Sequence, residues 1–253
     1  MSTFLIAEAG INHNGKLDQA YRLIDAAKAS NADAVKFQLF DSRKLWGDDR
    51  IKHLELRYDQ MVLLYGYCEN IGIEFMCTPF GVAELTFLAP MLKRVKIASG
   101  CLTNKALLEA ANATGLPVLL STGMSTRDEI WRAIGNLDDV ALTLLHCTSS
   151  YPCRLEDVNL LAMKWSEVPY GYSDHTTSIT VPIAAVALGA TVIEKHFTLD
   201  RNAEGPDHKA SITPKEFRAM HMAIVEVEAA LGDGFKRVMP CEEELRRLWR
   251  DKR

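Results

Sequence analysis

The feature that most constrains the fold is a regular alternation of two kinds of segment along the chain. Short apolar runs rich in β-branched and aromatic residues alternate with segments of helical period, such as LDQAYRLIDAAKAS, and we count eight such pairs. The predicted strands are residues 4–10, 34–40, 74–80, 94–100, 117–123, 141–149, 169–176 and 190–198, and each is followed by a plausible helix. Alternating strands and helices indicate a parallel sheet. Eight units in 253 residues predict an α/β fold, the (β/α)8 TIM barrel.

An open, doubly wound sheet is the structural alternative to a closed barrel. The sequence contains neither G-x-G-x-x-G after its first strand nor the phosphate loop G-x-x-x-x-G-K-[ST], which are the nucleotide-binding signatures of open sheets. We therefore predict one TIM-barrel domain over residues 1–239, followed by a terminal helix or tail over residues 240–253.

Composition narrows the classes of function. The net charge of -4 provides no basic field for nucleic acid or anionic lipid, and charge runs occur only in the tail CEEELRRLWRDKR. No stretch approaches the roughly 20 apolar residues of a membrane span. The six cysteines form no CxxC pair and are too sparse for a disulfide scaffold, which predicts reduced thiols in a cytoplasmic protein.

Polar residues gather at the carboxyl end of nearly every predicted strand, after its apolar part. They include Glu8, Lys36, Gln38, Thr78, Lys96, Ser99, Ser121, Tyr151, Ser173, Asp174, Glu194 and Lys195. In a (β/α)8 barrel these strand ends surround one mouth, where active sites lie. The pattern predicts that eight segments converge on one pocket, and the long polar loops 41–57 and 199–213 are expected to build or cover it.

Two histidines end neighbouring predicted strands, His175 in GYSDHT and His196 in EKHFTLD. Two neutral imidazoles side by side can hold a divalent ion and leave its other positions open to water or substrate oxygens. The alternative is that one or both are hydrogen-bonded core groups.

Lys36 and Lys96 lie inside predicted strands, where an unpaired ammonium is costly to bury. An anionic ligand such as a phosphate or carboxylate would satisfy them, with Ser99, Ser121 and Ser173 as hydroxyl donors. The alternatives are lysines that extend into solvent, or a Schiff-base lysine.

Glu8 ends the first predicted strand in EAGINHNG. Its carboxylate could orient a sugar hydroxyl or transfer a proton, while Asn12, His13 and Asn14 could hydrogen-bond a polyhydroxylated substrate. The alternative for Glu8 is a helix-capping role or a salt bridge to a barrel lysine.

A series of motifs resembles the N-terminal barrel of the sialic acid synthase family. They are, in order, IAEAGINHNG, ADAVKFQLF, FMCTPF, KIASG, PVLLSTGM, LLHCTSSYP, DVNL, GYSDHT, ALGATVIEKHFTLD and GPDHKAS. That family condenses phosphoenolpyruvate with an N-acetylated amino sugar. The resemblance implies phosphoenolpyruvate contacts at Lys36, Thr78, Lys96, Ser99, Ser121, Tyr151 and Ser173, manganese ligands at His175 and His196, and sugar contacts at Glu8, Gln38, Tyr151 and Asp207. It also implies a homodimer, and Mg²⁺ or Co²⁺ are alternatives to Mn²⁺.

The chain departs from the family pattern at two positions. Cys101 in SGCLTN stands where the family usually has a glutamate that faces the acceptor sugar, and Ser149 replaces a common asparagine. Family members usually continue into a C-terminal antifreeze-like domain, before which this chain is expected to stop. We therefore include Cys101 among the candidate catalytic residues and Ser149 among the substrate-binding ones.

The resulting hypothesis is a metal-assisted synthase that joins phosphoenolpyruvate to an aldose or amino-sugar acceptor. The product would be a sialic-acid-like 2-keto-3-deoxy acid, released with phosphate after C–O cleavage. Two alternatives remain open, a ligand-binding or regulatory barrel with reduced catalysis and a Schiff-base aldolase.

Overall fold

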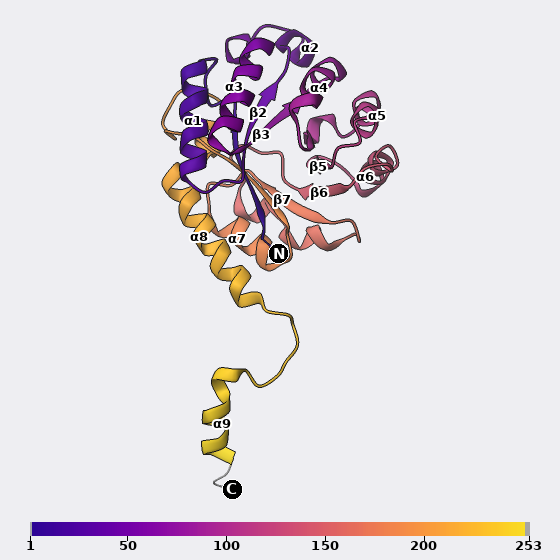
Figure 1. Ribbon diagram of the computed structural model, residues 1–253. Helices are drawn as coiled ribbons and strands as arrows, with labels where there is room; N and C mark the ends of the chain where they lie inside the picture. Colours follow the sequence, from indigo (N-terminus) through magenta and orange to yellow (C-terminus); the bar gives the residue numbers. More distant parts are fainter. Residues whose placement is uncertain (1, 251–253) are drawn as a thin grey trace.

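The chain forms a barrel of eight parallel strands, shown by a computed structural model that describes residues 2–250 (Figure 1). The strands are β1 Phe4–Gly10, β2 Ala34–Leu39, β3 Glu74–Pro79, β4 Val95–Ile97, β5 Val118–Ser121, β6 Leu142–His146, β7 Tyr170–Asp174 and β8 Val192–His196. They pair in the order β3-β2-β1-β8-β7-β6-β5-β4, and β4 packs beside β3 so that the barrel is nearly closed. The predicted TIM barrel is confirmed.

The helices that follow the strands along the chain lie on the outside of the barrel (Figure 1). They are α1 Leu17–Ala29, α2 Ser42–Trp46, α3 Tyr58–Ile71, α4 Val82–Leu88, α5 Lys105–Ala113, α6 Arg127–Ile134, α7 Thr180–Ala187 and α8 Pro214–Leu231. Their buried residues recur at helical spacing, as in α1, where Ala20, Leu23, Ile24 and Ala27 face the strands.

The segment after β6 does not form the helix expected there. Two 3-10 turns, Leu155–Asp157 and Leu160–Lys164, take its place. Asn159 between them adopts a left-handed conformation with φ of 50°, which interrupts any continuous helix. The buried side chains of Val158 and Met163 still cover the core, so packing is kept without a regular helix.

The barrel interior has an apolar layer and a polar layer stacked along its axis. The apolar layer consists of Ile6, Ala34, Met76, Leu119, Leu145 and Val192. Side chains on a strand alternate between its two faces, so residues two positions further on point into the same interior. Those residues are polar on most strands, and Glu8, Lys36 and Glu194 are examples. The apolar layer thus fills the barrel interior, and the ionisable groups lie next to it, nearer the carboxyl ends of the strands.

A buried ion pair outside the polar layer joins β7 to β8. The Lys195 ammonium lies 2.6 Å from the Asp174 carboxylate, and both side chains have no solvent exposure. Asp174 also accepts hydrogen bonds from Tyr172 Oη and Thr176 N. Lys195 and Asp174 alternate with inward-facing neighbours, so the expectation that they join the pocket was wrong.

The predicted tail contains a helix. After α8 ends at Leu231, the chain runs through residues 232–239 and a 3-10 turn, Pro240–Glu242, into α9, Glu243–Arg250. Figure 1 shows α9 away from the barrel. Residues 251–253 of the predicted tail lie outside the described residues. Within residues 2–250, no helix has the length and apolarity needed to cross a membrane.

Replacing Lys195 by methionine should lower the free energy of unfolding by about 3 to 5 kcal/mol, because Asp174 would remain buried without its counter-charge. Urea denaturation monitored by circular dichroism measures this change. The matched control is Lys93→Met, whose ammonium is largely exposed and 3.9 Å from Glu69, and which should cost less than about 1 kcal/mol. Equal losses in the two variants would contradict the role assigned to the pair.

Candidate active site

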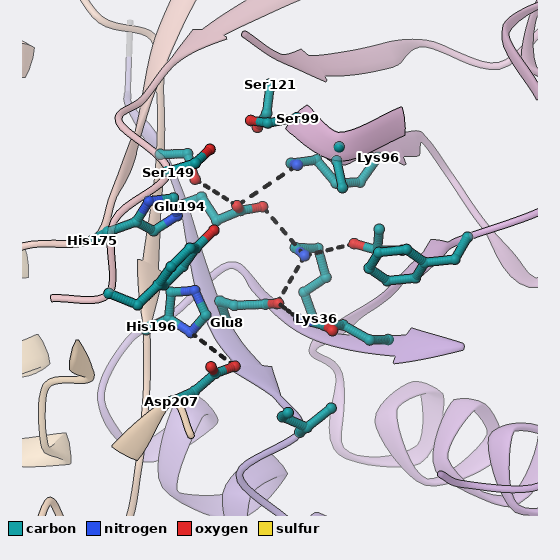
Figure 2. A pocket seen from close by; sticks show the side chains of 18 of the residues that line it. Glu8, Lys36, Lys96, Ser99, Ser121, Ser149, His175, Glu194, His196 and Asp207 are labelled. Atoms are coloured by element: carbon teal, nitrogen blue, oxygen red, sulfur yellow. Dashed lines mark hydrogen bonds and ion pairs between the residues drawn. The ribbon is translucent and has the colours of Figure 1, made fainter. Parts of the chain in front are cut away.

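A cavity of about 460 Å³ opens at the carboxyl ends of the strands (Figure 2). We call it the main cavity. Apart from Cys101 and the first-loop residues Asn12, His13 and Asn14, the predicted site residues all line it, namely Glu8, Lys36, Gln38, Thr78, Lys96, Ser99, Ser121, Ser149, Tyr151, Ser173, His175, His196 and Asp207. The two loops expected to build the pocket contribute as well, since Leu45 and Ile51 come from one and Pro206 and Asp207 from the other.

Lys36 is the centre of a buried charge network in this cavity (Figure 2). Its Nζ lies 2.8 Å from Glu8 Oε2 and 3.5 Å from Glu194 Oε2. It also donates a 2.7 Å hydrogen bond to Thr78 Oγ1. The strand register favours this arrangement, because Glu8 is paired in register with Lys36 on β2 and with His196 on β8.

The two carboxyl groups of the network have opposite pKa shifts. Burial raises the pKa of Glu8 to about 7, against the opposing effect of the Lys36 ammonium. Burial also disfavours the Glu194 carboxylate, but Lys36 and Lys96 outweigh it and lower the pKa of Glu194 to about 2. Burial works against the Lys36 ammonium too, yet Glu194 and Glu8 raise its pKa above the usual value. Glu194 is thus a fixed anion, whereas Glu8 can exchange a proton near neutral pH.

Glu194 was expected at the barrel mouth with the other polar strand-end residues but was given no role, although it is central to the network. It contacts both lysines, with Lys96 Nζ 3.8 Å from its Oε1, and accepts a 2.7 Å hydrogen bond from Ser173 Oγ. A sequence signal existed, because Glu194 lies two residues before His196 on the same strand and therefore on the same face.

The second lysine lies among hydroxyl groups that have spare hydrogen-bonding capacity. Lys96 Nζ donates to the backbone oxygen of Ile97 at 3.1 Å, and burial lowers its pKa. Ser121 Oγ and Ser149 Oγ are buried without a hydrogen-bond partner in the described structure. Unsatisfied buried hydroxyls beside an ammonium are suited to an anionic ligand with several oxygens.

His175 and His196 lie next to each other at the mouth, with ring centroids 5.4 Å apart. His175 Nδ1 is 2.6 Å from the backbone oxygen of Thr148, which leaves Nε2 for a ligand. His196 Nδ1 is buried without a hydrogen-bond partner and lies 3.8 Å from Asp207 Oδ2. Burial lowers the pKa of both rings, so both are neutral at pH 7.

This donor set fits a divalent ion that takes its remaining ligands from water or substrate. Neutral imidazoles with a free ring nitrogen are metal ligands, and a carbonyl group that accepts a hydrogen bond from the other ring nitrogen orients the ring. Among residues 2–250, no cluster of three or more His, Cys, Asp or Glu side chains is arranged to hold a metal. The protein part of such a site would therefore be the histidine pair, beside which the Tyr151 ring lies 4.2 Å from His175.

The first loop does not present its polar side chains to the main cavity as expected. Asn12 Nδ2 donates to the backbone oxygen of Phe197 and to Ser211 Oγ, and Asn14 Nδ2 donates to Glu204 O. These bonds tie the loop after β1 to the segment after β8. Ser211 Oγ in turn donates a hydrogen bond to the backbone oxygen of Asp207, so Asn12 contacts the pocket lining only through Ser211.

Cys101 is buried but lies outside the main cavity. It ends a 3-10 turn after β4 and lines an adjoining cavity instead. Burial raises the pKa of its thiol, which is therefore neutral at pH 7. Its assignment as a catalytic residue stays a prediction.

Comparison with known proteins agrees with this geometry. A model of the NeuB family matches residues 23–236. The chain is 42% identical over 276 residues to an N,N'-diacetyllegionaminic acid synthase of Legionella pneumophila, covering 97% of this chain and 77% of the relative. It is 36% identical over 266 residues to the human N-acetylneuraminate-9-phosphate synthase, covering 94% and 74%. The crystal structure of an N-acetylneuraminic acid synthetase from Leptospira borgpetersenii has a TM-score of 0.94 and 37% identity, and the match covers 100% of this chain and 94% of that one. The chain therefore belongs to the NeuB family.

Proposed function

We propose that the protein condenses phosphoenolpyruvate with an aldose or amino-sugar acceptor to give a sialic-acid-like 2-keto-3-deoxy acid and phosphate. The observation that carries the proposal is the buried pair of lysines among partly unsatisfied hydroxyls, beside two neutral histidines at the same barrel mouth. The names of the two synthases above agree with a keto-deoxy sugar acid as product.

Phosphoenolpyruvate would bind through its phosphate and carboxylate oxygens. Lys36 and Lys96 provide the charge, and the hydroxyls of Ser99, Ser121 and Ser173 line the same wall. Because these groups are held by packing before the ligand arrives, little reorganisation is needed on binding. In the reaction, C3 of phosphoenolpyruvate attacks the acceptor aldehyde, water adds at C2, and the C2–O bond to phosphate breaks.

His175 and His196 would hold a divalent ion, most simply Mn²⁺, with Mg²⁺ or Co²⁺ as alternatives. When bound, such an ion supplies Lewis-acid polarisation of the acceptor aldehyde. The electrostatics support it, since the carboxylates of Glu8, Glu194 and Asp207 offset both ammonium groups in the main cavity. A further positive charge would favour a polyanionic substrate there.

Glu8 would move the protons of the reaction. The aldehyde oxygen must gain a proton and the attacking water must lose one, so one carboxyl group can donate first and accept later. A pKa of about 7 suits both tasks near neutral pH. Gln38 Nε2 holds Glu8 Oε1 with a 2.9 Å hydrogen bond and fixes its orientation.

The second candidate function is a Schiff-base aldolase, favoured by one observation. Burial lowers the pKa of Lys96, and a neutral amine is the nucleophile of such enzymes. The Glu194 carboxylate beside Lys96 acts against this shift, because it favours the charged ammonium form.

We further propose a homodimer in the cytoplasm, in keeping with the sequence expectations.

The reaction is tested by phosphate release from phosphoenolpyruvate with Mn²⁺ across a panel of aldoses and N-acylated amino sugars. We expect release that depends on the acceptor, and its loss in Lys96→Met but not in the exposed control Lys93→Met. Borohydride treatment with pyruvate should leave Lys96 unmodified. A trapped adduct at Lys96 without phosphate release would refute the synthase proposal and support the aldolase.

Removal of either imidazole should weaken metal binding. In His175→Ala and His196→Ala, calorimetry with Mn²⁺ should show affinity lowered at least about tenfold, because the protein donor set would fall to one ring. His221, on the helix α8, provides the matched control His221→Ala, with affinity unchanged. Normal affinity in both site variants would refute the assignment.

The pH profile tests Glu8. Since its protonated form must donate first, kcat/KM should fall as the pH rises through about 7. Glu8→Gln should slow the reaction by about 100-fold and remove this limb of the profile. The control Glu109→Gln replaces a largely exposed carboxylate on α5 and should keep the profile. An unchanged limb in Glu8→Gln would exclude Glu8 as the titrating group.

A further inference from the structure

A thiol takes part in the hydrogen bonding of the main cavity without having been given a role so far. Ser99 begins the 3-10 turn after β4, Gly123 lies two residues after β5, and Cys147 directly follows β6. Gly123 N donates a 3.0 Å hydrogen bond to Ser99 Oγ, and Cys147 Sγ lies 3.1 Å from the same oxygen. We call these three residues the Ser99 cluster. Ser99 is the member that lines the main cavity (Figure 2).

The Ser99 cluster is packed so closely that position 123 has room only for glycine. A Cβ there would lie 2.9 Å from both Cys147 Sγ and Ser99 Oγ, and it would clash with Ser149 Oγ. The missing side chain lets the backbone of Gly123 approach Ser99 within hydrogen-bond distance. Because Cys147 is only 5% exposed, its thiol is held against Ser99 by packing.

The Ser99 hydroxyl has one hydrogen to donate and two lone pairs that can accept. The N–H of Gly123 occupies one lone pair. Two arrangements of hydrogens then fit the contact with Cys147, since either Ser99 donates to the sulfur or the thiol donates to Ser99. The first arrangement uses the Ser99 hydrogen inside the cluster, whereas the second leaves it for a ligand in the main cavity.

The thiol of Cys147 has a hydrogen to give at pH 7. Burial raises its pKa, against the opposing effects of the Ser99 hydrogen bond and the Lys96 ammonium. Sulfur is a weak hydrogen-bond acceptor, whereas a phosphate or carboxylate oxygen is a strong one. An anion in the main cavity therefore competes successfully with the sulfur for the Ser99 hydrogen, and the thiol hydrogen can then fill the second lone pair of Ser99.

We infer that Cys147 is a positioning residue for phosphoenolpyruvate, whose S–H group donates to Ser99 Oγ and so directs the Ser99 hydroxyl hydrogen toward an oxygen of the bound anion. The inference rests on the proposed function and adds a residue that acts through Ser99. A second observation points to the same ligand, because Ser121 Oγ and Ser149 Oγ are buried without a hydrogen-bond partner in the described structure, and Ser121 is only 2% exposed. An anion with several oxygens would satisfy these hydroxyls together with that of Ser99.

Calorimetry on the full chain tests this role, with phosphoenolpyruvate as the first probe and inorganic phosphate as the second. Cys147→Ala removes the donor and leaves the Ser99 hydroxyl free to rotate, so the affinity for phosphoenolpyruvate should fall about three- to tenfold, the effect of one hydrogen bond. Cys147→Ser keeps a donor and should stay within about twofold of the wild type. A thiol that served packing alone would be replaced no better by polar serine than by alanine, so equal weakening in the two variants would overturn the inference.

A double-mutant cycle shows whether Cys147 acts through Ser99. Ser99→Ala removes the hydroxyl itself and should weaken binding at least as much as Cys147→Ala. Adding Cys147→Ala to Ser99→Ala should then have no further effect, whereas fully additive losses would contradict the inference. The control Cys68→Ala removes another buried thiol, on α3, and should leave the dissociation constant unchanged.

Infrared spectroscopy reports the thiol hydrogen directly and does not depend on the stability of Cys147→Ala. The S–H stretching band of Cys147, identified by its loss in Cys147→Ser, moves to lower frequency when the thiol donates a hydrogen bond. At saturating phosphoenolpyruvate, the band should lie lower in the wild type than in Ser99→Ala. Equal frequencies would show that the thiol does not donate to Ser99.

Kinetics separates this inference from the proposed function. In Cys147→Ala the KM for phosphoenolpyruvate should rise while kcat stays within about twofold, because the lost contact is made in the ground state as well as in the transition state. The expected pattern of affinities without phosphate release from the wild type would refute the proposed reaction and leave the positioning role supported. If inorganic phosphate alone binds, the pattern of its affinities decides the positioning role. A wild type that binds neither probe would overturn both.

Discussion

The rest of the site depends on the Lys36 ammonium held between two carboxylates inside the barrel. An unpaired charge at this depth would cost several kcal/mol, so the lysine can be buried only together with its partners. Glu8, Glu194 and Thr78 supply them from three other strands. The buried ammonium group of Lys36 therefore requires carboxylates and a hydroxyl group on neighbouring strands at the same level of the barrel.

The same network separates the protonation behaviour of its acids. Burial disfavours both carboxylates, but Glu194 faces two ammonium groups and stays ionised, whereas Glu8 faces one ammonium group and also the negative charge of Glu194. A fixed anion and an exchangeable proton thus lie within one cluster. The two side chains are chemically identical, so the difference between their pKa values arises from their positions in the barrel.

The main cavity and the smaller cavity beside it are built from different parts of the fold. The charged lining of the main cavity is made largely by strand residues, whose positions are set by the barrel itself. The smaller adjoining cavity, which Cys101 lines, is made by the loops and helix starts after β2, β3 and β4, which can vary without disturbing the strands. The lining of the smaller cavity can therefore change while the charged residues of the main cavity stay the same.

The sequence alone determined the barrel and most of the cavity lining. Eight strand-helix units require a parallel sheet, and strand ends in a closed barrel must meet at one mouth, so Lys36 and His196 could be placed together without coordinates. Only the tertiary structure decided which buried charges pair and where the loop residues lie. Lys36 pairs with Glu8 and Glu194 inside the cavity, whereas Lys195 pairs with Asp174 outside it. Loop packing places Cys101 in the smaller adjoining cavity. The strands and their parallel pairing can be predicted from the local sequence pattern. Loop conformation and charge partners, in contrast, depend on contacts between segments far apart in the chain.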